Sequence, residues 1–178
     1  KKEGFPPLKI YGSHLKGQTI ELDGSISSQY ISALLLIAPT VENGLSLKLT
    51  GQLTSQSYIK LTLELMAKFG IQYKWEADTI TVKEQQYFPM DYTCEADWSG
   101  ASYWYQIMAL AESGEILLEN LHLNSLQGDA TIPAWFEQFG IVSTQSKDGV
   151  ILSKKGNIQP DNLVLNFIEN PDITQTMA

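Results

Sequence analysis

The sequence repeats itself with an offset of seventy residues, and this period constrains the fold more than any other feature. Three pairs of segments share the offset: Asn43-Gly44 with Ser113-Gly114, Lys68-Phe-Gly-Ile71 with Gln138-Phe-Gly-Ile141, and Asp78-Thr-Ile-Thr-Val82 with Asp148-Gly-Val-Ile-Leu152. A repeat of this length indicates a duplicated supersecondary unit. We therefore expect the chain to build one folding unit twice.

Hydrophobic periodicity predicts the order strand, helix, strand, helix, strand, strand within each unit. In the first unit the expected strands are residues 19–22, 45–49, 71–75 and 79–83, and the expected helices are 27–37 and 55–69. In the second unit the expected strands are 92–95, 116–121, 141–144 and 150–153, and the expected helices are 99–111 and 129–139. A helical stripe at Tyr58, Thr62, Leu65 and Phe69 should face a core, with Gly70 ending that helix in a left-handed conformation.

Both ends of the sequence extend the repeat. Residues 8–11 resemble the last strand of an earlier unit, and residues 163–167 resemble the first strand of a third. The chain is therefore expected to be an internal fragment of a longer array. The predicted fold class is α/β (α+β), with repeated β-α-β-α-β-β units and about two units in the fragment.

Composition excludes several classes of function. The apolar fraction of 43% and the mean hydropathy of −0.12 are those of an ordinary soluble protein, and no apolar run approaches the ~20 residues of a membrane span. A net charge of −8 disfavours binding to nucleic acid or to a membrane. One cysteine, Cys94, and two histidines predict no disulfide, no metal and no cofactor, as in a reducing cytoplasm.

A serine-rich turn carries the first functional signal. Gly24-Ser-Ile-Ser-Ser-Gln-Tyr30 follows an expected strand and opens an apolar helix. Backbone N–H groups, hydroxyls and the positive end of the helix dipole would meet there, which suits a phosphate or carboxylate. Serine is also a favoured N-cap, and for the turn taken alone we favour plain helix capping over anion binding.

Six segments resemble 5-enolpyruvylshikimate-3-phosphate synthases, the 3-phosphoshikimate 1-carboxyvinyltransferases, in the order and spacing of that family. They are Phe5-Pro-Pro-Leu8, Gly24-Ser-Ile-Ser-Ser-Gln-Tyr30, Ser55-Gln-Ser-Tyr-Ile59, Glu95-Ala-Asp-Trp-Ser-Gly-Ala-Ser-Tyr103, Asn124-Ser-Leu-Gln-Gly-Asp129 and Asn170-Pro-Asp172. The resemblance implies two domains, each an inside-out α/β barrel of three units. Residues 1–93 would belong to the shikimate-3-phosphate-binding domain and 94–178 to the start of the second.

The resemblance also implies a reaction in the shikimate pathway, which leads to chorismate and the aromatic amino acids. Such a transferase moves enolpyruvyl from phosphoenolpyruvate to the 5-hydroxyl of shikimate 3-phosphate and releases phosphate. The full-length protein would be cytoplasmic and monomeric, with these two small molecules as its partners.

Roles for individual residues follow from the same resemblance. Ser27, Ser28 and Ser55 would hold the 3-phosphate, and Gln29 would lie between the two substrates. Tyr58 would contact the shikimate ring, although packing along its helix is an equal alternative. Asp172 would be the acid/base carboxylate, with helix capping as the alternative.

Asp97 and Asp129 also precede expected helices, and for both we favour capping over direct chemistry.

Two other functions stay open at this point. A transferase acting on UDP-N-acetylglucosamine shares the fold and chemistry but usually carries a reactive cysteine on a mobile loop, whereas Cys94 is expected inside a strand as a core thiol. A non-catalytic binding module could use the same repeat. All twelve basic residues are lysine, so the arginines that usually grip phosphate and carboxylate are absent. We therefore expect the fragment alone to be inactive.

Overall fold

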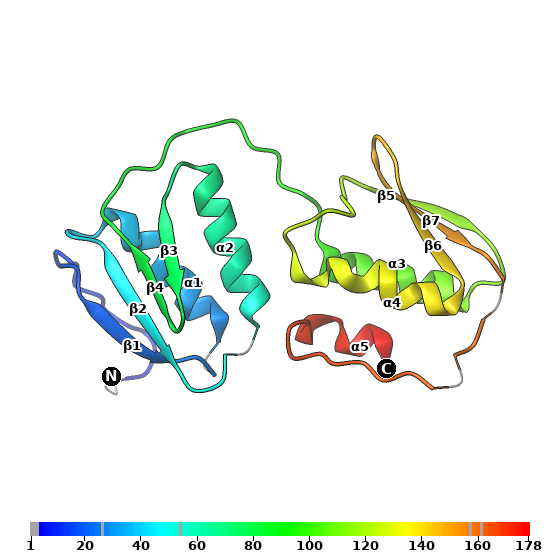
Figure 1. Cartoon of the computed structure of the whole chain (residues 1–178), viewed down its shortest axis with the longest axis horizontal. Coiled ribbons are helices and arrows are strands. Elements are labelled where there is room, and N and C mark those ends of the chain that lie inside the picture. The colour runs from blue at the N-terminus through cyan, green and yellow to red at the C-terminus, as the bar shows by residue number, and fades with distance from the viewer. Residues whose placement is uncertain (1–3, 26, 54, 157, 161) are drawn as a thin grey trace.

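The computed structural model describes residues 4–25, 27–53, 55–156, 158–160 and 162–178, and it contains two separate sheets (Figure 1). We call residues 19–82 the N-terminal lobe. Its elements in chain order are β1 (Thr19–Asp23), α1 (Ser28–Ile37), the short 3₁₀ helix η1 (Ala38–Thr40), β2 (Leu45–Thr50), α2 (Gln56–Lys68), β3 (Tyr73–Glu76) and β4 (Thr79–Val82). This is the predicted β-α-β-α-β-β order.

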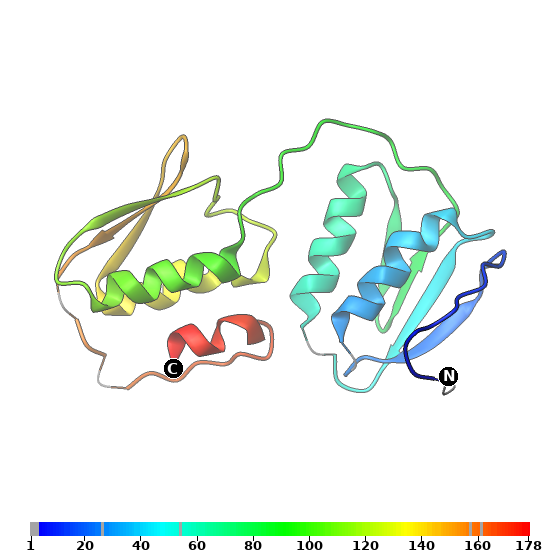
Figure 2. The same cartoon turned by 180° about the vertical axis from the view of Figure 1, so that it is seen from behind.

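The sheet of the N-terminal lobe has the strand order β1-β2-β4-β3. β1 runs parallel to β2, as a crossover through α1 requires, and β3 and β4 form the predicted antiparallel hairpin. Leu45, Leu47 and Leu49 alternate with partly exposed residues along β2, so one face of the sheet is apolar. Both helices cover that face, as the view from behind shows (Figure 2).

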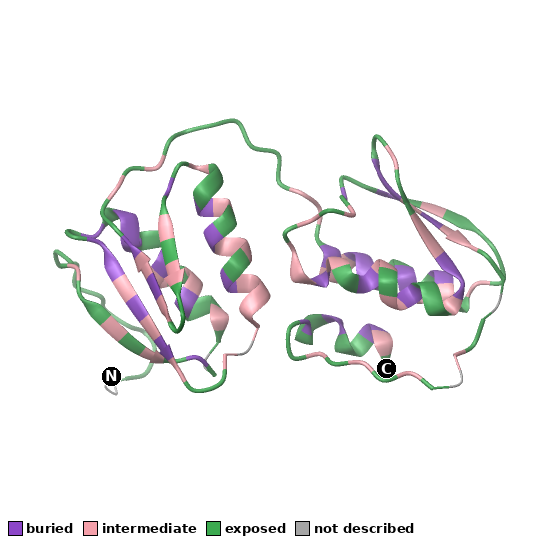
Figure 3. Ribbon diagram, in the orientation of Figure 1, coloured by how far each residue is buried: buried purple, intermediate pink, exposed green. Residues whose placement is uncertain are grey.

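Residues 98–177 form the C-terminal lobe. Its elements are α3 (Trp98–Leu110), β5 (Glu115–Glu119), η2 (Gly128–Thr131), α4 (Ile132–Phe136), η3 (Glu137–Phe139), β6 (Ile141–Gln145), β7 (Gly149–Lys154), η4 (Pro171–Ile173) and α5 (Thr174–Met177). The sheet is antiparallel with the order β5-β7-β6. Its core forms around Trp98, Tyr105 and Phe136 and is separate from the N-terminal core (Figure 3).

The predicted first strand of the second unit, residues 92–95, is not a strand. In the N-terminal lobe the equivalent β1 lies along β2, but here the segment belongs to the connection between β4 and α3 (Figure 1). The ring of Tyr92 packs against Phe69 at the end of α2, with 5.8 Å between centroids. The Cys94 carbonyl accepts from Nδ2 of Asn120 at 2.7 Å, just beyond β5, but among the described strands β5 pairs with β7 alone, so the second unit lacks its parallel strand.

Three further predictions need correction. The expected helix 129–139 is divided into η2, α4 and η3, with Pro133 in the first turn of α4. Residues 8–11 form no strand. Residues 163–167 alternate between half-buried and exposed but pair with no strand, although Phe167 meets Trp135 edge-on with 5.4 Å between ring centroids.

The predicted stripe on α2 does not face the core. The buried residues of that helix are Ile59, Leu63 and Met66. The four residues of the predicted stripe are only half-buried: Tyr58, Thr62, Leu65 and Phe69. The stripe instead contacts the C-terminal lobe through Tyr58, which bonds to Asp172, and the connection between the lobes through Phe69, which packs against Tyr92. Gly70 does end the helical segment with a left-handed φ of 88°.

Candidate functional site

The first wall of the candidate site is set by the parallel pair β1 and β2. Because parallel strands end at the same edge of a sheet, the helices that follow them begin side by side. The Gly24 N–H donates to the carbonyl of Thr50, 2.7 Å away, which ties the two strand ends together. Ser32 and Thr62 share a hydrogen bond of 2.8 Å between α1 and α2. The N-termini of both helices therefore lie at one end of the lobe (Figure 2).

Ser27 is the N-cap of α1. Its Oγ accepts a hydrogen bond of 3.3 Å from the backbone N–H of Gln29. Ser27 and Gln29 are exposed and Ser28 is half-buried. The capping interpretation of this turn is confirmed, and the exposed groups leave its predicted role in binding an anion intact.

Ser55 begins α2 in an unusual conformation. It adopts a left-handed backbone with φ of 53°, and its hydroxyl makes no capping bond. Its backbone N–H instead donates to the carbonyl of Ile168 in the C-terminal lobe, 3.3 Å away. A helix start whose hydroxyl is not committed to a cap suits contact with a ligand.

Tyr58 and Asp172 meet across the two lobes. The Tyr58 hydroxyl donates a hydrogen bond of 2.6 Å to Oδ2 of Asp172, which lies in η4. Burial raises the pKa of Tyr58 well above its ordinary value, and the carboxylates of Asp172 and Asp129 add to the rise. Asp172 is exposed and does not form a side-chain cap, so its carboxylate is available to a ligand.

Asp129 does not cap a helix, contrary to our expectation. It is buried within η2 and accepts two hydrogen bonds, 2.5 Å from Oγ of Ser99 and 3.1 Å from Nδ2 of Asn170. Asp97 does cap α3, accepting from the N–H groups of Ser99 and Gly100 at 3.2 and 2.8 Å. The two aspartates therefore have different roles.

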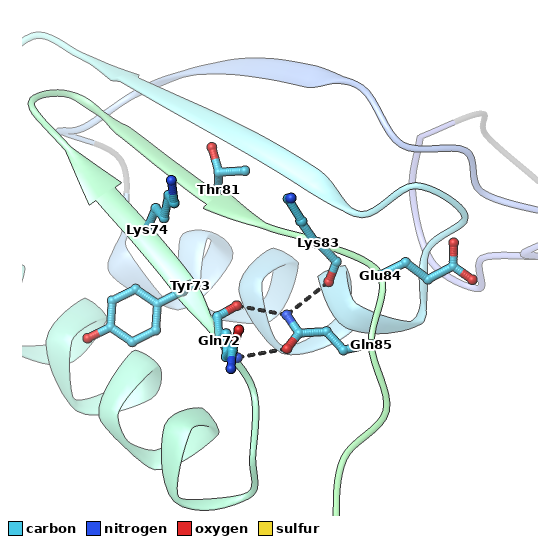
Figure 4. A pocket seen from close by; sticks show the side chains of 7 residues that line it. All are labelled: Gln72, Tyr73, Lys74, Thr81, Lys83, Glu84 and Gln85. Atoms are coloured by element: carbon cyan, nitrogen blue, oxygen red, sulfur yellow. Dashed lines mark hydrogen bonds between the residues drawn. The ribbon is translucent and has the colours of Figure 1, made fainter.

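The pocket in Figure 4 lies elsewhere, at the outer edge of the N-terminal sheet. Its volume is about 350 Å³ and it is lined by residues of β3, β4 and the segment after β4. The Gln85 side chain pairs there with the backbone of Gln72, accepting from its N–H at 2.8 Å and donating to its carbonyl at 2.7 Å. None of the predicted site residues lines this pocket.

The part of the chain that the structure describes lacks both a metal-binding cluster and a membrane-spanning helix. No cluster of three or more His, Cys, Asp or Glu side chains could hold a metal ion there. No described helix has the length and apolar character needed to cross a bilayer.

Comparison with known proteins decides the family. The family model described as EPSP synthase (3-phosphoshikimate 1-carboxyvinyltransferase) matches residues 1–178. The chain belongs to the EPSP synthase family. It is similar to 3-phosphoshikimate 1-carboxyvinyltransferases of Bacteroides fragilis (45% identity over the whole chain), Vibrio cholerae (33% over the whole chain) and Methanosphaerula palustris (35% over 99% of the chain).

The chain spans less than half the length of these EPSP synthases: 43%, 42% and 41% of each, respectively. The chain is also similar to a solved structure of EPSP synthase from Acinetobacter baumannii. The matched region covers 82% of this chain and 50% of the Acinetobacter chain. Its TM-score is 0.50 and its identity 16%, which supports the α/β fold alone.

One argument against the UDP-N-acetylglucosamine transferase was wrong. Cys94 is exposed and lies in the connection between the lobes, not inside a strand. The choice in favour of EPSP synthase rests instead on the family match and on the names of the relatives.

The structure brings together part of the predicted EPSP synthase site. Ser55, Tyr58 and Asp172 converge where α2 meets the segment 168–172. The Ser27–Gln29 turn lies at the same end of the lobe, but among the described residues no hydrogen bond links it to Tyr58 or Asp172. The sequence did not single out Ser99 and Asn170 as site residues. Both donate to Asp129, which lies 30 positions after Ser99 and 41 positions before Asn170. Only their membership of the matched motifs could have indicated them.

Proposed function

We propose that the full-length protein transfers enolpyruvyl from phosphoenolpyruvate to the 5-hydroxyl of shikimate 3-phosphate, and that this chain supplies the shikimate-phosphate side of the site. The observation that carries the proposal is the 2.6 Å contact between Tyr58 and Asp172. This contact supports the proposal because Asp172, the proposed base, lies beside the start of α2, to which the proposed phosphate ligand Ser55 also belongs. A base and a phosphate-binding helix start are the two elements that this acceptor requires.

The proposed roles divide between the helix starts and the carboxylate. Ser27, Ser28 and Ser55 hold the 3-phosphate with hydroxyl and N–H donors, each worth about 1.5–3 kcal/mol to a charged acceptor. Gln29 lies at the junction of the two substrates, where its amide can donate to one and accept from the other. Asp172 accepts the proton of the 5-hydroxyl as that oxygen bonds to the enol carbon of phosphoenolpyruvate. The methylene carbon gains a proton, and loss of phosphate and of one methyl proton restores the double bond.

The same proposal places residues 1–93 in the shikimate-phosphate-binding domain and residues 94–178 in the second domain. The separation of the two hydrophobic cores supports this division. We further propose that the full-length protein is a cytoplasmic monomer that uses no metal or organic cofactor.

Ser27→Ala in the full-length protein tests the proposal. Phosphate release is measured while each substrate is varied in turn. We expect the KM for shikimate 3-phosphate to rise about tenfold or more, with little change in the KM for phosphoenolpyruvate, because the hydroxyl would contact only the former. Ser146→Ala removes a hydroxyl from the β6–β7 turn and is the matched control. Equal loss for both substrates would mean that the Ser27 turn only supports the fold.

A further inference from the structure

We propose that Tyr58 is a positioning residue for Asp172, held in its orientation by Ser99 and Asp129, and that it acts on the carboxylate more than on the shikimate ring. This inference rests on the proposed function, because it assumes that Asp172 is the base. It goes further in giving Tyr58 a role in the chemical step rather than in substrate affinity.

The contact between Tyr58 and Asp172 joins the two lobes. Tyr58 belongs to the first turn of α2 in the N-terminal lobe, and Asp172 belongs to η4 in the C-terminal lobe. The distance of 2.6 Å is typical of a charge-assisted hydrogen bond between a hydroxyl and a carboxylate, which is stronger than one between neutral groups. An exposed aspartate can rotate freely about its side-chain bonds unless something holds one oxygen. Tyr58 holds Oδ2 and leaves Oδ1 of Asp172 for a substrate hydroxyl.

The hydroxyl protons of Ser99 and Tyr58 go to different carboxylates. Ser99 contacts Tyr58, but its own proton is directed to Oδ2 of Asp129 at 2.5 Å. The proton of Tyr58 is therefore the one available to Asp172. Burial first, then the hydrogen bond to Asp172 and the negative charges of Asp129 and Asp172, raise the pKa of Tyr58, so the phenol stays a donor throughout the neutral range.

Asp129 also fixes the loop that carries the base. Asn170 donates to Oδ1 of Asp129 at 3.1 Å, and both side chains are at least 95% buried. Asn170 lies only two residues before Asp172. One buried carboxylate thus binds Ser99, which lies beside Tyr58, and also Asn170, which belongs to the segment that carries Asp172.

Kinetics of full-length variants test the inference. In Tyr58→Phe we expect kcat to fall about ten- to hundredfold, while the KM for shikimate 3-phosphate changes less than about threefold. The reason is that the lost hydrogen bond is to the carboxylate of Asp172, the proposed base, and not to the substrate. The matched control is Tyr73→Phe, which removes a hydroxyl that also donates to a carboxylate, Glu64, at 2.8 Å but lies away from the site. That control should keep its kcat.

Combining Tyr58→Phe with Ser99→Ala separates positioning from general loss of structure. If Ser99 acts through Tyr58, Ser99→Ala lowers kcat in the wild type and has almost no effect in the Tyr58→Phe background. Additive effects of the two substitutions, or a Tyr58→Phe variant that raises only the KM for shikimate 3-phosphate, would overturn the inference.

The outcomes also distinguish this inference from the proposed function. A wild-type protein that releases no phosphate from the two substrates would refute the function itself. An active wild type with an unchanged kcat in Tyr58→Phe would refute only the positioning role.

Discussion

Ser57 donates a hydrogen bond of 2.8 Å from its hydroxyl to the backbone carbonyl of Glu169, a residue 112 positions further along the chain. The Ser57 N–H also donates to the Glu169 carboxylate, at 3.2 Å. Tyr58, the next residue, bonds to Asp172. The first turn of α2 and the segment 168–172 therefore form the main polar contact between the lobes. The candidate site therefore depends on how closely these two segments approach.

Gly128→Ala should force the lobes apart. A Cβ at residue 128 would come within 2.6 Å of Cβ and 2.7 Å of Oγ of Ser57, which is closer than atoms of this kind can approach. We expect the free energy of unfolding to fall by roughly 1–3 kcal/mol, measured by urea denaturation. Adding Ser57→Gly removes the colliding Cβ and should recover part of the loss. A double variant less stable than Gly128→Ala alone would contradict this explanation.

Leu63→Ala should destabilise the N-terminal lobe by about 2–5 kcal/mol, because the Leu63 side chain is completely buried between α2 and the sheet. Leu36→Ala removes the same atoms from a residue that is 49% exposed on α1 and is the control. Denaturant titration of both variants measures the difference. Similar losses in both would show that α2 is not packed as described.

Tyr105 should make stability fall in alkali. Burial raises the pKa of Tyr105 to about 12, and the hydroxyl of Ser143, 2.8 Å away, opposes part of the rise. An unfolded tyrosine has a pKa near ~10. The folded protein thus binds the proton more tightly, and this contribution is complete below pH ~10 and is lost as the pH rises toward 12. Urea titrations of wild type and Tyr105→Phe across this range should show a shallower decline in the variant. Parallel declines would mean that Tyr105 does not cause the loss.

The isolated chain should bind shikimate 3-phosphate only weakly and should not turn over. It carries a net charge of −8 and has no arginine, so a phosphate and a carboxylate would meet few compensating cations. Isothermal titration calorimetry and a phosphate-release assay check both statements. Binding in the low micromolar range would show that the serine-bearing helix starts suffice.

The fold of the N-terminal lobe could be predicted because its signals are local. Alternating leucines at 45, 47 and 49 and the turn at residues 76–78 define elements that pair with near neighbours. The missing strand at 92–95 could not be predicted, since its residues alternate suitably but Tyr92 is held by Phe69 and by the Lys68 ammonium, 5.5 Å from the ring. The segment contacts both lobes in place of pairing as a strand, and no local pattern encodes such contacts.

The candidate site was predictable in part. The serine at the start of α1 carries a capping signature, and the motifs named Ser55, Tyr58 and Asp172 by resemblance. The pairing of Tyr58 with Asp172 spans 114 positions and two lobes, and no local pattern encodes such a distance. Asp129 looked like a cap because it precedes a helix, but its burial against Ser99 and Asn170 depends on how η2 packs.

The connection between the lobes is anchored at both ends. The Phe88 N–H donates to the carbonyl of Phe69 at 2.9 Å, and the Ala96 N–H donates to the carbonyl of Asn120 at 2.8 Å. Between these two hydrogen bonds, the ring of Tyr92 packs on Phe69 and the Cys94 carbonyl accepts from Nδ2 of Asn120 at 2.7 Å. The connection thus acts as a short tether with a fixed pivot at each end, so swinging the lobes apart would separate Tyr58 from Asp172 while keeping the two halves within reach of each other.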